Sequence, residues 1–153
     1  MSNEIELAGL PDFLKEKASG INSKLEKAIG LCCKKVHDDI QFNMAHTPRN
    51  MSKSYYTNNQ SKAHHPSLPE NPPAVDTGRL RDSINYEVQG SGQEVYGIVG
   101  STLKEPDYAF WTEYGTTKMV QRPWLRPAMK SNNDFIRKSI TKAVQETFAG
   151  GNQ

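Results

Sequence analysis

The first third of the chain carries a helical pattern of apolar side chains. Between Leu10 and Met44 these residues recur in steps of three and four, which places them on one stripe of a single long helix. The stripe consists of Leu14, Ala18, Ile21, Leu25, Ala28, Cys32, Val36 and Ile40. Gly20 and Gly30 each cost a helix about 1 kcal/mol relative to alanine, so a bend or break near either fits the pattern. At about 1.5 Å per residue the helix can reach roughly 50 Å, and we expect part of its stripe to contact another subunit.

The next segment, residues 47–74, has no such pattern. It contains five prolines and hardly any aliphatic side chain. Such a composition cannot bury enough apolar surface to offset the entropy of ordering the chain. We therefore predict a long flexible loop or insertion, or a segment that becomes ordered on assembly.

A β-hairpin is predicted after this segment. Asp76 and Thr77 are suited to cap a short helix that continues to Ser83. Apolar and polar residues then alternate over residues 84–89, as in a half-buried strand. A turn at Gly90-Ser91-Gly92 follows, and the return segment 95–100 is apolar on both faces, which predicts a more central strand.

Two helices and a short strand are predicted for the remainder. Residues 108–114 form a short helix that ends at Gly115, because glycine tolerates the left-handed conformation of a helix end. Residues 116–122 return as a strand. Pro123 and Pro127 lead into a final helix, whose apolar side consists of Ala128, Phe135, Ile136, Ile140, Ala143, Val144 and Phe148. The whole chain, 1–153, is predicted to be one α+β domain: a long N-terminal helix, a small antiparallel sheet built on a hairpin, a short helix, and a C-terminal helix packed on the sheet.

Composition narrows the classes of function. A chain of 153 residues has room for one modest core. Its apolar fraction of 35% and mean hydropathy of −0.73 make it more polar than an average domain, so we expect much of its surface to be meant for partners, or part of it to fold only on assembly. The net charge of +2 argues against a general nucleic-acid-binding surface. The acidic N-terminus and the lack of a long apolar run predict a cytoplasmic product without membrane contact.

Neither a metal site nor a disulfide is indicated. Cys32 and Cys33 are adjacent, so they cannot join distant segments, and we interpret them as core thiols in a reducing compartment. None of the four histidines is spaced as a ligand pair or lies beside a cysteine ligand motif; they are His37, His46, His64 and His65. We expect no cofactor and no metal.

Catalysis is not indicated either. The chain has no nucleophile-elbow motif, no phosphate-binding loop and no dinucleotide-binding motif. The paired carboxylates Asp38 and Asp39 lie near the polar side of the long helix, where solvated side chains are the ordinary case. We therefore expect a protein that is not an enzyme.

One motif stands out: the sequence VDTGRLRDSI at residues 75–84. It predicts a rigid turn that directs Leu80 and Ile84 to the core and projects the guanidinium groups of Arg79 and Arg81. Arginine in this role holds carboxylates or phosphates by two-point contacts. A helix cap with two solvated arginines is the alternative interpretation.

Four motifs in series resemble one family. They are PPAVDTGRLRDSI, a hairpin that ends in Val99-Gly100-Ser101, the segment YAFWTEYGT at 108–116, and RPWLRPA at 122–128. Together they resemble the neck or tail-completion (minor tail, head-tail joining) proteins of long-tailed bacteriophages of the HK-ninety-seven type. The resemblance covers residues 75–130, and residues 49–73 depart from it as an insertion.

The resemblance implies a small α+β virion protein without catalysis. Family members form a cyclic homo-oligomeric ring, and we expect a hexamer or dodecamer here. The partners implied are head-closure or connector proteins on one side and a tail terminator or tail tube on the other. DNA passes through the channel only as cargo. The implied location is the neck or tail of the virion, after synthesis in the host cytoplasm.

The resemblance also assigns residues. Asp76, Thr77, Gly78 and Arg79, with Arg81 beside them, correspond to a structural turn used in assembly. A subunit interface is implied for Glu113, Tyr114, Gly115, Arg122 and Pro123. Trp111 and Trp124 suit either this interface or the core.

Other functions stay open at this point. A tail-terminator or minor tail subunit that binds the end of the tail tube would share these features. A small nucleic-acid-binding regulator predicts a basic groove and a steep salt dependence of DNA affinity, for which the chain has little charge. A hydrolase lacks a nucleophile paired with a base.

Overall fold

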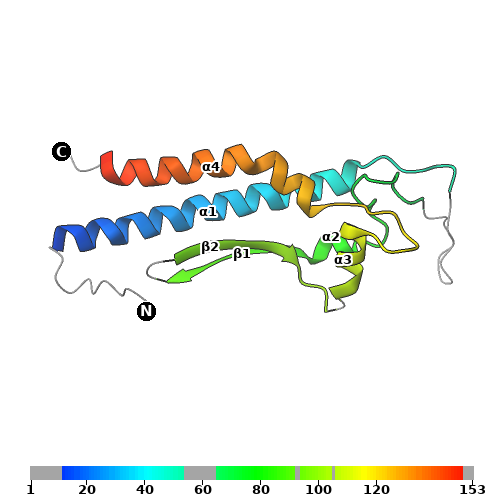
Figure 1. The fold of residues 1–153 in the computed structure, drawn as a ribbon, viewed down its shortest axis with the longest axis horizontal. Coiled ribbons are helices and arrows are strands. Elements are labelled where there is room, and N and C mark those ends of the chain that lie inside the picture. Colours follow the sequence, from blue (N-terminus) through cyan, green and yellow to red (C-terminus); the bar gives the residue numbers. More distant parts are fainter. Residues whose placement is uncertain (1–11, 54–64, 92–93, 105, 150–153) are drawn as a thin grey trace.

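The computed structural model describes residues 12–53, 65–91, 94–104 and 106–149. Its elements are α1 (Asp12–His46), α2 (Arg79–Ser83), β1 (Ile84–Ser91), β2 (Glu94–Ser101), α3 (Pro106–Tyr114) and α4 (Leu125–Ala149). Figure 1 shows an elongated molecule in which α1 lies between α4 and the hairpin, with α2 and α3 gathered near one end. The predicted α+β class and the predicted order of helices and hairpin are confirmed.

Helix α1 runs without interruption for 35 residues, so neither Gly20 nor Gly30 breaks it. Its C-terminal half is covered by other elements of the same chain, and the buried positions there are Ala28, Cys32, Cys33, Val36, Ile40 and Met44. Ile21 and Leu25, nearer the N-terminus, are only partly covered. Contact of this stripe with another subunit stays a prediction for that part of α1.

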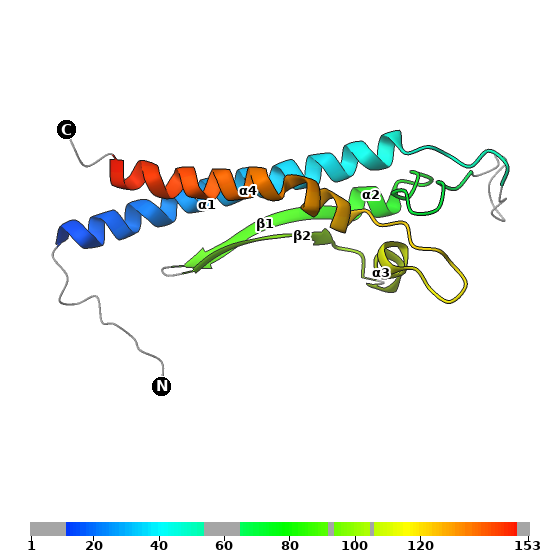
Figure 2. The same ribbon diagram turned by 45° about the horizontal axis from the view of Figure 1, so that its top comes forward.

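The hairpin presents one face to α1 and leaves the other exposed (Figure 2). Strands β1 and β2 are antiparallel, with Ile84 opposite Ser101 and Val88 opposite Gly97. Tyr96 and Ile98, which alternate with Gly97, belong to the outer face and are exposed. The prediction of a central strand is wrong, because β2 pairs only with β1 in the described part of the chain. Its second apolar face meets no other layer there.

Helix α4 packs along α1 and completes the core at its N-terminal end. Its side toward the sheet includes Leu125, Met129, Ile136 and Ile140, which line an apolar groove together with residues of α1 and β2. The core cluster itself joins α1, α2, the start of β1, α3 and the start of α4, and comprises Val36, Ile40, Met44, Leu80, Ile84, Ala109, Trp124 and Ala128.

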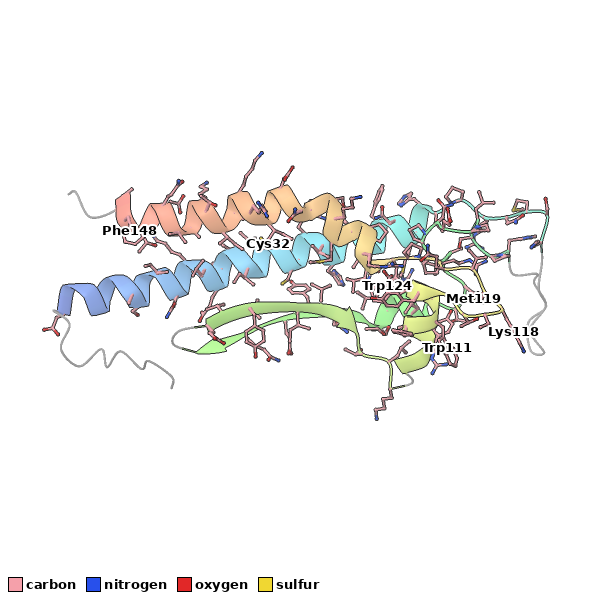
Figure 3. The ribbon with its side chains drawn as sticks, in the orientation of Figure 1. Cys32, Trp111, Lys118, Met119, Trp124 and Phe148 are labelled. Atoms are coloured by element: carbon pink, nitrogen blue, oxygen red, sulfur yellow. The ribbon has the colours of Figure 1, made fainter. Side chains whose placement is uncertain are left out.

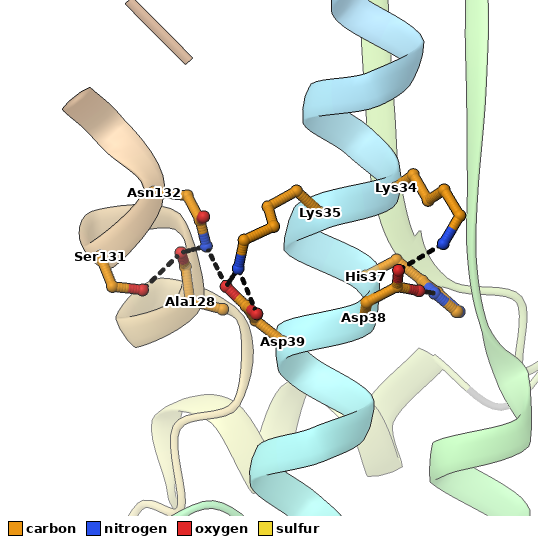
Figure 4. Close-up of polar contacts among 8 residues, drawn as sticks. All are labelled: Lys34, Lys35, His37, Asp38, Asp39, Ala128, Ser131 and Asn132. Atoms are coloured by element: carbon orange, nitrogen blue, oxygen red, sulfur yellow. Dashed lines mark hydrogen bonds and ion pairs between the residues drawn. The ribbon is translucent and has the colours of Figure 1, made fainter. Parts of the chain in front are cut away.

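A polar contact fixes α4 against α1. The amide of Asn132, which is buried, donates to Asp39 Oδ2 at 2.7 Å and to the carbonyl of Ala128 at 2.9 Å (Figure 4). Lys35 binds the same Asp39 carboxylate. Burial alone would raise the pKa of Asp39, but the hydrogen bonds from Lys35 and Asn132 outweigh it and hold the pKa below its ordinary value.

The predicted strand at residues 116–122 is wrong, whereas the loop predicted at 47–74 stays a prediction. Residues 116–122 form no strand; they make a tight turn with a single bridge between Thr116 and Met119, because the left-handed Gly115 (φ 78°) turns the chain back on itself. The described ends of segment 47–74 are ordered against each other. Arg49 and Ser67 form a bridge, supported by a 2.7 Å bond from Asn50 N to Pro66 O. Residues 54–64 of the predicted loop lie outside the described residues.

Candidate functional site

The turn of the VDTGRLRDSI motif is built around a left-handed glycine. Gly78 has φ 82°, is buried, and precedes α2 as its N-cap residue. Its carbonyl accepts a 2.8 Å bond from Asp82 N, and the Thr77 hydroxyl accepts a 3.3 Å bond from Arg79 N. The N-cap position therefore belongs to Gly78, which makes no side-chain cap bond, and not to Asp76 or Thr77 as predicted. A Cβ at Gly78 would lie 2.8 Å from Asp82 Oδ2.

The other end of the motif clamps the hairpin. The Ser83 hydroxyl donates to Leu80 O at 2.6 Å and shares a 2.8 Å bond with the Ser101 hydroxyl across the two strands. The Ser83 carbonyl accepts from Thr102 N at 2.8 Å. Leu80 and Ile84 face the core, as predicted. The motif thus orders the base of the hairpin.

The two arginines differ in their surroundings. Arg81 pairs with the neighbouring Asp82 (Nε to Oδ1, 2.7 Å), and its carbonyl accepts a 2.9 Å bond from Gln41 of α1. Arg79 and Asp76 are exposed, and each has a polar partner. Because Arg81 is engaged within the chain, the motif does not project two equivalent free guanidinium groups.

Glu113 caps α4 from a distance in the sequence. Its carboxylate accepts backbone bonds from Trp124 N (2.6 Å), Leu125 N (2.9 Å) and Arg126 N (3.0 Å). The guanidinium of Arg126 adds a fourth bond, from Nε to Glu113 Oε1 at 2.9 Å. These are the unpaired N–H groups of a helix N-terminus, where a carboxylate is favoured by both hydrogen bonding and the helix dipole.

Two of the predicted interface residues, Glu113 and Trp124, have their contacts within one subunit. Glu113 is only 3% exposed, and Trp124 is a core residue whose indole donates to Ala109 O at 3.3 Å. Burial alone would raise the pKa of Glu113, but the backbone donors of Leu125, Trp124 and Arg126 and the Arg126 guanidinium outweigh it and lower the pKa. Of the two roles predicted for Trp124, interface or core, the structure therefore shows the core role.

The remaining interface candidates lie around the end of α3. Gly115 is partly buried in its left-handed turn, and a Cβ there would lie 2.7 Å from Met119 O. Pro123 and Arg122 are partly buried, and Arg122 N donates to Thr112 O at 2.8 Å. Trp111 and Tyr114 are exposed. Whether any of them contacts a neighbouring subunit stays a prediction.

Helix α3 presents an aromatic surface to solvent. Ala109, Thr112 and Glu113, three and four residues apart, face the interior. The opposite side carries the four exposed aromatic residues Tyr108, Phe110, Trp111 and Tyr114, which we call the α3 aromatic surface. Phe110 and Tyr114 are in ring contact at 4.7 Å, and the Arg126 guanidinium lies 4.6 Å from the Tyr114 ring centroid. These contacts position Phe110 and Tyr114 within the surface before any partner binds.

A second apolar surface is concave. The apolar groove between α1, β2 and α4 has a volume of about 540 Å³ and is lined by side chains such as Ile29, Val36, Val99, Met129 and Ile140. Cys32 and Cys33 are also among its lining residues, and burial raises the pKa of both thiols, which fits the predicted structural role. Sequence patterns gave no sign of this groove, since it depends on how far α4 stands from β2.

The described residues contain no cluster of side chains that could form a metal centre. No group of three or more His, Cys, Asp or Glu side chains there is placed to hold an ion. His37 donates through Nε2 to Ile84 O (3.2 Å), His46 binds Phe42 O (2.8 Å), and His65 binds Lys53 O (3.0 Å), so each serves local structure. His64 lies outside the described residues. None of the helices described is both long and apolar enough to span a membrane.

Comparison with known proteins gave no family assignment: neither family models, nor curated proteins, nor solved structures produced a match. The candidate site therefore rests on the geometry above. Sequence reasoning identified Trp111 and Tyr114 but missed Tyr108 and Phe110 as members of the same surface. Four aromatic residues within the nine residues of α3 were the available signal.

Proposed function

We propose that this chain is a structural subunit of a long-tailed bacteriophage virion that closes into a homo-oligomeric ring at the head-to-tail joint. Its task is to join parts of the virion without making or breaking a covalent bond. The head-side partner is a head-closure or connector protein, and the tail-side partner is a tail terminator or tail tube. The motif series of residues 75–130 supports this phage assignment.

The α3 aromatic surface is the observation that supports self-association most directly. Trp111 is 47% exposed and Phe110 is 58% exposed. Large aromatic side chains gathered on one exposed helix face are typical of protein interfaces, where Trp and Tyr contribute much of the binding energy. The internal face of α3 is occupied by its own core contacts, so the aromatic side remains available.

A ring requires two different complementary surfaces on each subunit. The exposed α3 aromatic surface and the apolar groove between α1, β2 and α4 provide such a pair. We propose that the aromatic surface of one subunit packs against the groove side of the next. Repetition of this heterologous contact closes a ring when the rotation between subunits divides a full turn.

Native mass spectrometry of the purified full-length chain tests ring formation. We expect a single closed species of defined subunit number, with a hexamer or dodecamer as the expected size. In a second assay, the protein is mixed with tail-less heads and with head-less tails. We expect it to be required for joining them into complete particles.

A matched pair of variants tests the interface. Phe110→Glu places a charge in the α3 aromatic surface, whereas Phe148→Glu places the same charge on an exposed phenylalanine at the far end of α4 (Figure 3). We expect Phe110→Glu to abolish the ring and joining, and Phe148→Glu to leave both intact, with equal melting temperatures. A monomer that still joins heads to tails would contradict the ring. A ring that restores no joining would contradict the virion assignment.

A further inference from the structure

A pocket lies beside the VDTGRLRDSI turn, separate from the apolar groove. Its volume is about 140 Å³, and its walls come from several parts of the chain, including Met44 of α1. Residues 75–81 form one wall, Pro66 and Ser67 from the base of segment 47–74 form another, and Tyr108 and Arg122 complete it. The segment that departs from the family pattern thus contributes directly to this pocket.

Two residues that line the pocket each carry a buried polar atom without a partner among the described residues. Ser67 is 1% exposed, and its hydroxyl has no hydrogen-bond partner among the described residues. The Nε of Arg122 is likewise buried without a partner there. A buried donor left unpaired costs on the order of 1–3 kcal/mol. Two such atoms, on two residues that line one pocket, point to a site where a bound group would supply the missing hydrogen-bond partners.

The chemistry of the donors limits what this group can be. A guanidinium only donates hydrogen bonds and always carries a positive charge, so the group must present acceptor atoms. A hydroxyl can also donate to an acceptor. The walls include three arginines, Arg79, Arg81 and Arg122, against one carboxylate, Asp76. Both the hydrogen-bond donors and the excess of arginines over carboxylates disfavour a bound cation.

We propose that this pocket binds an oxyanion, either a carboxylate or a phosphate group, through Arg122 Nε and the Ser67 hydroxyl. Bonds between a guanidinium and an anionic oxygen are about twice as strong as neutral ones. The volume suffices for such a group, since one water takes about 30 Å³ in the liquid. Asp76, Thr77 and Arg79 at the pocket are exposed, which gives the anion a route from solvent.

Isothermal titration calorimetry of the full-length protein tests the site. Sodium phosphate and sodium acetate are titrated separately at constant ionic strength, with sodium chloride as the reference anion. We expect saturable binding of at least one of the two oxyanions with one site per chain, and none of chloride. Arg122→Gln is expected to weaken this binding by about tenfold or more, because a charge-assisted bond is lost. Ser67→Ala is expected to weaken it about threefold to tenfold.

Two controls separate the site from general charge effects. Arg137→Gln removes an exposed arginine of α4 outside the pocket and is expected to leave the affinity unchanged. Ser67→Ala removes a buried hydroxyl without a partner in the described residues, so its melting temperature in the absence of oxyanion is expected to equal or exceed that of the wild type. Three results would overturn the proposal. The first is that neither oxyanion binds. The second is that neither Arg122→Gln nor Ser67→Ala weakens the binding, and the third is that Arg137→Gln weakens it equally.

A further measurement identifies the source of the oxyanion. If an acidic side chain of a second copy occupies the pocket, phosphate competes with self-association in sedimentation velocity, and Arg122→Gln reduces self-association. If a free anion occupies it, self-association is the same with and without phosphate. The titration is carried out on the chain itself, so its outcome does not depend on whether rings join heads to tails.

Discussion

Gly97 of β2 lies directly against Cys33 of α1, so closely that a methyl group at Gly97 would overlap the cysteine sulfur. The same methyl group would lie 2.8 Å from Ile29 Cγ2. The hairpin therefore approaches the helix at a point where only glycine fits. This contact sets the distance between the sheet and α1, which in turn defines one side of the apolar groove.

We predict that Gly97→Ala lowers the free energy of unfolding by about 1–3 kcal/mol, the usual cost of overpacking a filled interior. Urea denaturation followed by circular dichroism measures the change. Cys33→Ala removes the overlapping sulfur, so the double variant is expected to recover part of the loss, and the coupling between the two positions gives the size of the clash. Gly100→Ala is the control in the same strand, because a Cβ there meets nothing within 4 Å. Equal losses at Gly97 and Gly100 would mean that close packing on α1 is not the cause.

The left-handed conformation of Gly78 leads to a second prediction. Gly78→Val is expected to lower the free energy of unfolding by about 1–3 kcal/mol, because a β-branched residue is strained at φ 82°. Its Cβ also meets Asp82 Oδ2 at 2.8 Å. Thermal denaturation measures the effect. Gly78→Asn should lose less, since asparagine tolerates the left-handed conformation better. A melting temperature of Gly78→Val equal to that of the wild type would contradict the assigned turn.

The buried carboxylate of Glu113 leads to a prediction of how the stability of the folded chain depends on pH. Its pKa in the folded chain is lowered from the ordinary 4.5, so the unfolded chain binds the proton more readily. The stabilisation is complete above pH 4.5 and is lost as the pH falls through the lower folded pKa. We expect Glu113→Gln to cost about 1.5–3 kcal/mol at pH 7, the scale for hydrogen bonds to a charged group, because its main partners are backbone N–H groups and the Arg126 side chain is half-exposed. The difference from the wild type should shrink as the pH is lowered.

Urea denaturation of both proteins at a series of pH values measures this difference. Asp39, whose pKa is also lowered, adds acid sensitivity to both proteins and cancels when they are compared. Glu146→Gln alters an exposed carboxylate of α4 and should follow the wild type at every pH. A difference between Glu113→Gln and the wild type that stays constant across the acid range would show that the carboxylate charge is not what caps α4.

Local patterns account for the elements that were predicted correctly. The apolar stripe of α1, the alternation that starts at Ile84 and the glycine at position 115 each act through neighbouring residues, so the chain itself reveals them. The buried role of Glu113 could not be foreseen in this way. Its partners lie 11 to 13 residues away, across a turn whose path the sequence pattern does not specify.

The wrong prediction that β2 is a more central strand has a different physical origin. A strand with apolar residues on both faces ordinarily lies between two layers. Here the inner face packs on α1, whereas Tyr96 and Ile98 remain exposed on the outer face. Sequence periodicity records which side chains are apolar, and it cannot tell whether an internal layer or another molecule covers them. The same limit applies to Phe110 and Trp111 of the α3 aromatic surface.

Two adjacent aspartates of α1 give a final prediction, because each binds a lysine of α1 and only one of them has a bond to α4 recorded among the described residues. The partners of Asp38 there are Lys34 and His37 of its own helix, whereas Asp39 accepts the 2.7 Å bond from the buried Asn132 of α4 (Figure 4). Exposed pairs four residues apart on a helix contribute about 0.3–0.5 kcal/mol. We therefore expect Asp38→Ala to change the free energy of unfolding by no more than about 0.5 kcal/mol.

Asp39→Ala should cost more, about 1–2 kcal/mol, since Asn132 then loses an anionic acceptor and keeps only the Ala128 carbonyl. Urea denaturation measures both variants, and hydrogen exchange of α4 amides shows whether the loss is local to that helix. In the double variant Asp39→Ala with Asn132→Ala the two losses should not add, because each change removes the same bond. Additive losses, or equal effects at Asp38 and Asp39, would mean that the contact does not fix α4 on α1. The apolar groove, which α4 completes, would then be held by side-chain packing alone.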